Sequence, residues 1–179
     1  MIIGLVRQKG AGKDTVADYL VREHGFTKLA FADPVKKVCE AMFALDSIYF
    51  HCPLLKEQVI PAWGMSPREM MQKVGTDIVR TQMGDRFWIK HMQVRIDSLP
   101  PDTKIVISDV RFVNEAEFIH SLPDSHLVRV QLQSRVRDVD NHISETEQSN
   151  IMTNHVIHND MCEGGLIKLY RQCDSLVLI

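Results

Sequence analysis

The residues with the clearest chemical meaning stand near the N-terminus, where the sequence RQKGAGKDT runs from Arg7 to Thr15. Gly10 and Gly12 can adopt backbone angles that other residues avoid, so successive N–H groups can turn inward around an anion. Lys13 adds a full positive charge, and a helix that begins here would direct the positive end of its dipole to the same place. This pattern predicts a site for the phosphate tail of a nucleotide, and therefore phosphoryl transfer.

The loop departs from the common pattern G-x-x-x-x-G-K-[ST] at two positions. Arg7 stands where the first glycine is expected, and Asp14 stands where a hydroxyl would bind magnesium, with the hydroxyl of Thr15 one place later. The presence of Arg7 suggests that the backbone has ordinary angles there, since a left-handed conformation would strain it. We expect Lys13 to be partly exposed and to contribute little to packing. The alternative to a nucleotide site is an ordinary turn between a strand and a helix.

A second candidate group follows the apolar segment Lys104–Ser108, which reads as a buried strand. Asp109 comes directly after it and Arg111 two residues later. In an open parallel sheet, ligands bind at the carboxyl ends of the strands. Asp109 could therefore hold magnesium through water and orient Arg111, or it could be only a turn or cap residue.

Arg68 lies in the first turn of a predicted helix, where the helix dipole disfavours a cation unless an anion is nearby. A substrate phosphate could be that anion, or Glu69 could neutralise Arg68 on the surface. Gly75, in the middle of this helix, costs about 1 kcal/mol relative to alanine. That cost suggests the close approach of another group, for which a neighbouring helix is favoured over a flat base.

Trp88 could stack on a base, or it could pack in the core with Phe87 and Ile89. Arg135 and Arg137 are two residues apart in a polar stretch and would project the same way if the chain were extended. They suit a lid that closes cations over a transferring phosphoryl group, or a solvated charged loop.

The elements that must position these residues alternate along the chain. Asp33 reads as a helix N-cap before Pro34, and Ser66 with Glu69 as a capping box. Met70, Val74 and Ile78 are expected to share one apolar helix face. Strands are predicted at 2–6, 28–31, 104–108, 127–132, 156–158 and 176–178, and helices at 14–24, 34–42, 67–78, 85–96, 114–121 and 163–172, with an irregular stretch at 46–64. The alternation predicts an α/β fold, a mainly parallel sheet with helices on both faces.

The chain as a whole narrows the function classes. Its 179 residues suit one domain, and no linker or repeat divides them. The net charge is −2, and acidic and basic residues are interspersed along the chain. The sequence therefore lacks the basic stripe of a protein that binds duplex nucleic acid. No apolar run is long enough for a membrane span or a secretory signal, so we expect a cytoplasmic protein whose four scattered cysteines are reduced thiols.

Five blocks in order resemble the phage-type deoxynucleoside monophosphate kinases. They are KGAGKDT at 9–15, FADPVK at 31–36, KEQVIPAWGMSPREMMQKVGTD at 56–77, SDVRFVNEAE at 108–117 and DNHISE at 140–145. The resemblance implies a three-layer α/β/α P-loop fold like that of the nucleoside monophosphate kinases. It also implies one domain over 1–179, with a helical substrate-binding insertion at about 46–98 and a short lid at about 133–147. The implied reaction transfers the γ-phosphoryl group of ATP to a deoxynucleoside monophosphate with Mg²⁺.

The same resemblance implies roles by position. The ATP-binding residues would be Lys9, Gly10, Ala11, Gly12, Lys13, Asp14, Thr15, Arg135 and Arg137. The catalytic residues would be Lys13, Asp14 and Arg111, and the magnesium ligands Asp14, Thr15 and Asp109. The substrate would lie against Lys36, Arg68, Asp77, Trp88, Asp109 and Arg111.

Two other functions remain open from the sequence. A phosphomevalonate-kinase-like enzyme would share the G-K-D loop and the S-D-x-R block, although WGMSPREMMQKVGTD favours the nucleotide acceptor. A nucleotide-binding regulatory or assembly protein that has lost turnover through Arg7 would bind ATP without acceptor-dependent ADP release. These motifs do not determine which base is preferred or whether a dNMP is selected over an NMP. They also leave the oligomeric state open, and a homodimer is one possible state.

Overall fold

The computed structural model describes residues 1–7, 11–132, 150–160, 162 and 164–178. Lys9, Gly10, Arg135, Arg137 and the predicted lid at 133–147 lie outside the described residues. The chain forms two compact units. Unit 1 comprises Met1–Ala30 and Asp97–Ile179, and unit 2 comprises Phe31–Ile96.

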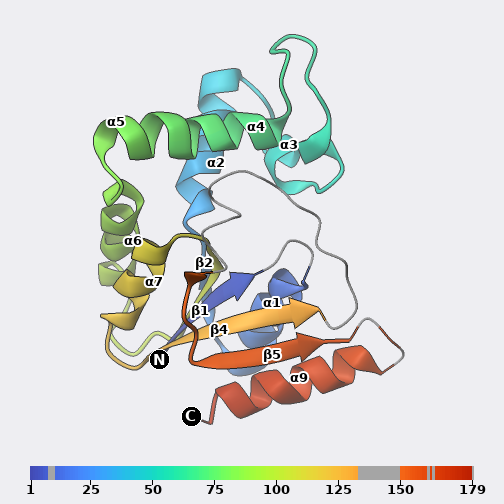
Figure 1. Cartoon of the computed structure of the whole chain (residues 1–179), viewed down its shortest axis with the longest axis vertical. Helices are drawn as coiled ribbons and strands as arrows, with labels where there is room; N and C mark the ends of the chain where they lie inside the picture. Colours follow the sequence, from blue (N-terminus) through green and yellow to red (C-terminus); the bar gives the residue numbers. More distant parts are fainter. Residues whose placement is uncertain (8–10, 133–149, 161, 163, 179) are drawn as a thin grey trace. The chain divides into compact units, whose positions relative to one another are not determined.

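Unit 1 is built on a five-stranded parallel sheet in the order β2-β3-β1-β4-β5 (Figure 1). The strands are β1 (Ile2–Arg7), β2 (Thr27–Leu29), β3 (Ile105–Val110), β4 (Ser125–Leu132) and β5 (His155–Asn159). β1 is central, with Ile3 in register with Val106 of β3 and His126 of β4. The predicted parallel sheet is confirmed, and its carboxyl-end edge brings together the segments that follow each strand.

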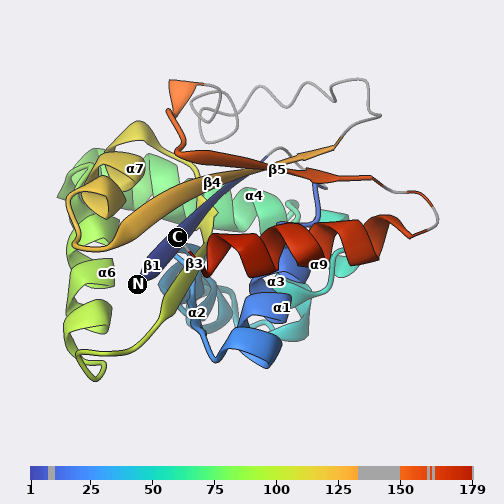
Figure 2. The same cartoon turned by 90° about the horizontal axis from the view of Figure 1, so that it is seen from below.

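Helices cover both faces of the sheet. α1 (Lys13–His24) and α9 (Gly165–Leu176) lie on the same face (Figure 2), where Ile3 and Leu5 contribute to a core that includes Leu20 and Leu169. α7 (Val113–His120) covers the opposite face. Gly4, which alternates with Ile3 and Leu5 along β1, faces this side, since a Cβ at Gly4 would meet Ile119 of α7. The pleat of β1 therefore sends successive side chains into two apolar layers.

The predicted strand at 176–178 is wrong, because α9 continues to Leu176. Leu169, Cys173 and Leu176 are all buried. They follow one another at intervals of four and three residues, so they form one face of a helix. The short apolar run at the C-terminus suggested a strand, but burial of this helical face against the sheet decides the conformation.

Unit 2 is helical. It contains α2 (Ala32–Phe43), α3 (Ile48–His51), η1 (Leu55–Glu57), α4 (Pro67–Gln72), η2 (Lys73–Arg80), α5 (Thr81–Met83) and nearly all of α6 (Phe87–Asp97). The stretch 46–64, predicted to be irregular, carries only the two short turns α3 and η1.

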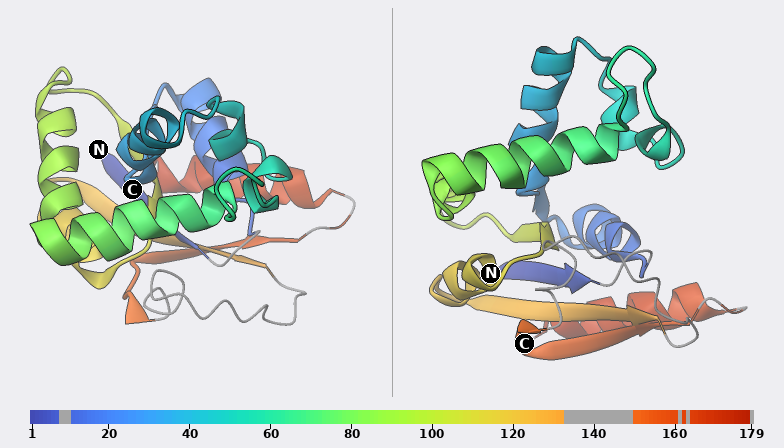
Figure 3. Two further views of the ribbon diagram at one scale, coloured as in Figure 1. Left: turned by 90° about the horizontal axis from the view of Figure 1, so that it is seen from above. Right: turned by 45° about the horizontal axis from the view of Figure 1, so that its top comes forward.

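α4, η2 and α5 follow one another as a single helical rod (Figure 3). The predicted capping box is confirmed: Ser66 Oγ accepts from Glu69 N at 3.3 Å, and Glu69 Oε2 accepts from Ser66 N at 2.7 Å. Met70 and Val74 are buried as expected, but Ile78 is 49% exposed and that prediction is wrong. Since η2 is a π-helix with wider turns, the period of the α-helix does not continue through it.

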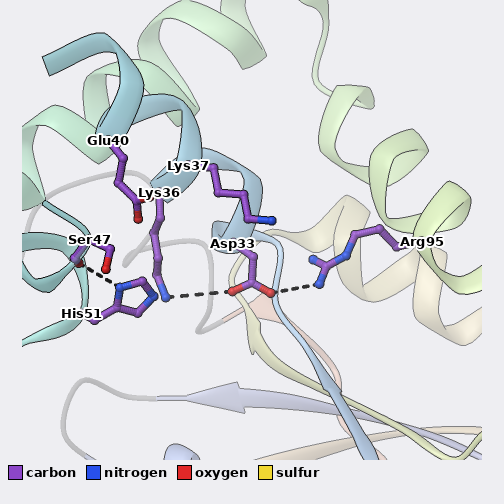
Figure 4. Close-up of a pocket in the computed structure, with 7 residues that line it drawn as sticks. All are labelled: Asp33, Lys36, Lys37, Glu40, Ser47, His51 and Arg95. Atoms are coloured by element: carbon purple, nitrogen blue, oxygen red, sulfur yellow. Dashed lines mark hydrogen bonds and ion pairs between the residues drawn. The ribbon is translucent and has the colours of Figure 1, made fainter. Parts of the chain in front are cut away.

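The predicted N-cap at Asp33 is also wrong, because α2 already begins at Ala32. The carboxylate of Asp33 instead binds cations within unit 2. Its Oδ2 lies 3.1 Å from a guanidinium nitrogen of Arg95, and its Oδ1 lies 3.9 Å from Lys36 Nζ (Figure 4). A carboxylate in the first turn still interacts favourably with the positive end of the helix dipole. Asp33 therefore stabilises α2 without a capping hydrogen bond.

Candidate functional site

The loop of interest leaves β1 at Arg7, which is the last residue of the strand and is in register with Val130 of β4. This pairing gives the Arg7 backbone ordinary strand geometry, as the sequence suggested. An arginine at this position therefore does not require the left-handed angles that favour glycine.

We expect Arg7→Gly to leave kcat/KM for ATP within about threefold of the wild type. The stability should fall by about 0.5–1 kcal/mol, because glycine within a strand loses more conformational freedom on folding. Steady-state kinetics and thermal melting measure the two effects separately. A drop in kcat/KM of more than about tenfold at an unchanged melting temperature would instead assign the arginine side chain to the reaction.

Gly12 is the residue at which the loop turns into α1, and its conformation favours glycine. It has φ 85° and ψ 22° at the N-cap of the helix, in the left-handed region. A Cβ atom there would lie 2.4 Å from Asn159 Nδ2, and that amide donates a hydrogen bond to the carbonyl of Ala11 at 3.1 Å. The sequence analysis missed Asn159, although its place at the carboxyl end of β5 matches that of Asp109 on β3.

Lys13 is buried, with a side chain only 10% exposed, so the expectation of a partly exposed lysine is wrong. Its Nζ lies 3.1 Å from Asp14 Oδ2. The second oxygen of Asp14 lies 3.3 Å from Nζ of Lys28, on β2, which also binds Asp18 at 2.8 Å. Two lysines therefore converge on one carboxylate at the first turn of α1, and Lys28 was not singled out from the sequence.

Desolvation would by itself raise the pKa of Asp14, but the charges and hydrogen bonds of Lys13 and then Lys28 outweigh it. The net effect holds the pKa of Asp14 below its ordinary value. Asp14 is therefore ionised at neutral pH, while its side chain remains 63% exposed and open to a ligand.

Asp109 lies within β3, one residue before the strand ends, and it is a buried carboxylate with 6% exposure. Arg111 follows the strand and is partly exposed. The buried Glu115 of α7 accepts hydrogen bonds from the backbone N–H groups of Arg111 at 2.9 Å and Phe112 at 3.2 Å. These bonds fix the backbone that carries Arg111, a role of Glu115 that the sequence analysis did not recognise.

The oxygen atoms that could hold a metal come from Asp14, Thr15 and Asp109, all in unit 1. Among the residues that the structure describes, no three His, Cys, Asp or Glu side chains gather as a metal site. Magnesium is commonly bound through one or two carboxylates together with substrate phosphates, so the chemistry of this set fits that ion.

The predicted substrate residues of unit 2 have different surroundings. Arg68 binds Glu57, with Nε 2.7 Å and a terminal guanidinium nitrogen 2.6 Å from Oε1, whereas the sequence offered Glu69 as the alternative to a substrate phosphate. Asp77 is exposed on η2. Lys36 is half-buried, with its ammonium group near Asp33.

Trp88 is 6% exposed, and its indole N–H donates to the carbonyl of Gly75 at 2.8 Å. Its ring packs edge-on against Phe87. A Cβ at Gly75 would lie 3.2 Å from Val35 of α2, so a neighbouring helix explains this glycine, as favoured from the sequence. Of the two roles that the sequence left open for Trp88, core packing and base stacking, these contacts show core packing.

Comparison with known proteins shows the family to which the chain belongs. The family model for deoxynucleotide monophosphate kinase matches residues 54–172. A protein of Acanthamoeba polyphaga mimivirus, provisionally named a deoxynucleotide monophosphate kinase, is 35% identical over 173 residues, which cover 88% of this chain and 86% of the relative. The chain belongs to the deoxynucleotide monophosphate kinase family. The deoxynucleoside-5'-monophosphate kinase of Escherichia phage T5 is 32% identical over 66% of this chain and 50% of its own length.

Among solved structures, the shikimate kinase of Bacteroides thetaiotaomicron aligns over 100% of this chain and 99% of its own, with a TM-score of 0.50 and 11% identity. At this identity the likeness concerns the fold alone. It confirms the predicted P-loop α/β fold for this member of the kinase family. No helix among the described residues combines the length and the apolar character needed to cross a membrane.

Proposed function

We propose that this family member transfers the γ-phosphoryl group of ATP to the phosphate of a deoxynucleoside monophosphate, giving ADP and the deoxynucleoside diphosphate. The observation that carries the proposal is the arrangement of residues at the N-terminus of α1. There Gly12 takes a left-handed conformation, Lys13 follows it as a buried cation, and the helix directs its positive dipole end toward the loop. The membership of the deoxynucleotide monophosphate kinase family supplies the acceptor class.

In this proposal the residues of unit 1 bind ATP. The backbone from Lys9 to Thr15 surrounds the phosphates, and Lys13 neutralises the charge of the group in transit. Asp14, Thr15 and Asp109 would hold magnesium, which neutralises phosphate charge when bound. Phosphoryl transfer needs little covalent chemistry from the protein. The rate enhancement therefore comes from positioning the two substrates and neutralising charge in the transition state.

The acceptor is assigned to the remaining residues. Lys36, Arg68 and Asp77 of unit 2 bind it, and Arg111 of unit 1, held by the bonds to Glu115, acts on the phosphates. Within this proposal the chain works as one kinase domain with its insertion at about 46–98. Arg135 and Arg137 belong to the lid, where two added cations would complete the binding of ATP.

The test is ADP release, measured by a coupled assay, with ATP, Mg²⁺ and a panel of dNMPs, NMPs and phosphomevalonate. Turnover that depends on a dNMP supports the proposal and identifies the preferred base. Turnover with phosphomevalonate alone would replace it with the small-molecule kinase. Tight ATP binding without acceptor-dependent ADP release would favour the regulatory or assembly protein.

Arg68→Ala should raise KM for the dNMP by about tenfold or more and leave KM for ATP unchanged, because a charge-assisted contact to the acceptor is lost. Initial-rate kinetics with each substrate varied in turn measure both constants.

The matched control for Arg68 is Glu57→Gln, which breaks the same ion pair from its other side. If Arg68 binds the acceptor, this control leaves KM for the dNMP close to the wild-type value. Equal effects of the two substitutions would mean that Arg68 serves only to hold Glu57.

A further inference from the structure

The side chain of Asn159 connects the last strand of the sheet to the loop that precedes α1. Asn159 ends β5, where it is in register with Leu132 of β4, and β4 separates it from β1. It is only 8% exposed, and its amide nitrogen donates to the carbonyl oxygen of Ala11 at 3.1 Å. A buried amide on the edge strand therefore holds the loop one residue before the left-handed Gly12.

This hydrogen bond orients a whole peptide group. The bond between Ala11 and Gly12 is trans, and in a planar trans peptide the C=O and N–H groups point in opposite directions. Because the carbonyl of Ala11 faces Asn159, the N–H of Gly12 points away from Asn159. Rotating this peptide group would take the buried carbonyl of Ala11 away from its donor, which is costly. Asn159 therefore fixes the direction of a backbone N–H group at the start of α1.

The glycine at position 12 permits this contact. A Cβ at Gly12 would overlap the amide nitrogen of Asn159, so the amide can reach the carbonyl of Ala11 only because the next residue has no side chain. The carbonyl of Gly12 in turn accepts from the N–H of Val16 at 3.1 Å, in the first turn of α1. The orientation set by Asn159 is thus continuous with the backbone of the helix that carries Lys13.

A second side-chain amide binds the backbone of β5 but does not contact the loop. Gln172 of α9 accepts from the N–H of His158 and donates to the carbonyl of the same residue, both at 2.9 Å. Asn159 and Gln172 are therefore comparable as amides that each bind the backbone of another element. They differ in that only Asn159 binds the loop before α1.

We propose that Asn159 is a positioning residue for the phosphate donor, because its amide sets the peptide group between Ala11 and Gly12 so that the Gly12 N–H faces the phosphates of ATP. The inference rests on the proposed function for the identity of the ligand. Asn159 does not touch the nucleotide in this proposal, and it acts through the backbone of the loop. Its loss should therefore weaken ligands that carry the phosphate tail and spare the acceptor.

The experiment measures calorimetric binding of ATP, inorganic tripolyphosphate and a dNMP to the intact chain. Asn159→Leu keeps the branched shape and loses the donor. It should weaken ATP and tripolyphosphate in parallel, by about three- to tenfold, the scale of one hydrogen bond. Affinity for the dNMP should stay unchanged. An unchanged affinity for ATP, a loss for ATP without one for tripolyphosphate, or an equal loss for the dNMP would overturn the proposal.

Gln172→Leu is the matched control, because it removes the other amide that binds the backbone of β5. It should lower the melting temperature and leave the affinity for ATP unchanged. An equal loss of ATP affinity in this control would mean that the effect comes from β5 as a whole and would overturn the proposal. Should Asn159→Leu fail to fold, Asn159→Ala carries the same test, since it removes the amide without adding bulk.

A double-mutant cycle tests the contact itself. Gly12→Ala should lower the melting temperature less in the Asn159→Ala background than in the wild type, because the amide that the new Cβ would meet is absent. Affinity for ATP should not recover, since Ala11 still lacks its donor. Strictly additive losses of stability would overturn the proposal. Wild-type binding of ATP without dNMP-dependent ADP release would contradict the proposed function alone, because the ATP affinities of the variants still decide the role of Asn159.

Discussion

Replacing Lys13 by methionine is expected to lower kcat by about 100-fold or more, the scale found when one preorganised charge is removed from a phosphoryl or oxyanion site. Methionine keeps an apolar stem of similar length in a position where the lysine side chain is only 10% exposed. The substitution therefore removes the ammonium group with little change in packing. Single-turnover measurements with saturating ATP and dNMP report the chemical step directly.

Lys28→Met is the control for this substitution, because Lys28 and Lys13 bind the two oxygens of the same carboxylate, Asp14. Only Lys13 directly follows the left-handed Gly12. A role in catalysis predicts a large loss of kcat for Lys13 and a small one for Lys28. Comparable losses would point to the ionisation or placement of Asp14, and kcat within about threefold of the wild type would remove Lys13 from the mechanism.

The sheet and the two ends of α1 could be predicted from the sequence because local patterns determine them. Apolar runs alternate with amphipathic helices, which is the pattern of a parallel sheet covered on both faces. Gly12 precedes Lys13 at the start of α1, and Gly25 ends the same helix in the left-handed conformation that its type suggested. Each of these signals lies within a few residues of the structure it predicts.

Contacts between distant segments could not be predicted in the same way. Asn159 reaches the loop from a position 148 residues away in the sequence, and Glu57 rather than the adjacent Glu69 neutralises Arg68. The burial of Lys13 and the exposure of Ile78 likewise depend on what packs around them. Patterns of spacing specify which face of an element is apolar, but they do not specify the partner that each polar side chain finds.

Gly12→Ala is expected to reduce ATP binding and turnover by at least about tenfold, because a Cβ would enter the space of the Asn159 amide and disturb the carbonyl of Ala11. The left-handed angle adds about 1–2 kcal/mol of strain for alanine. For a chain of this size that strain corresponds to a fall of about 2–8 °C in the melting temperature. Nucleotide titration, kcat/KM and thermal melting should be measured on the same preparation.

Gly25→Ala provides the matched control at the other end of α1. Gly25 is also left-handed, with φ 69°, but nothing lies within 4 Å of the position a Cβ would take. Both substitutions therefore introduce comparable backbone strain, and only Gly12→Ala should change ATP affinity. If the two variants lose stability and activity in parallel, the effect of Gly12 is on folding and the loop is not the ATP cradle. If ATP affinity falls for Gly12→Ala alone, the geometry of this turn is required for nucleotide binding, as expected for a loop whose backbone N–H groups must face the phosphates.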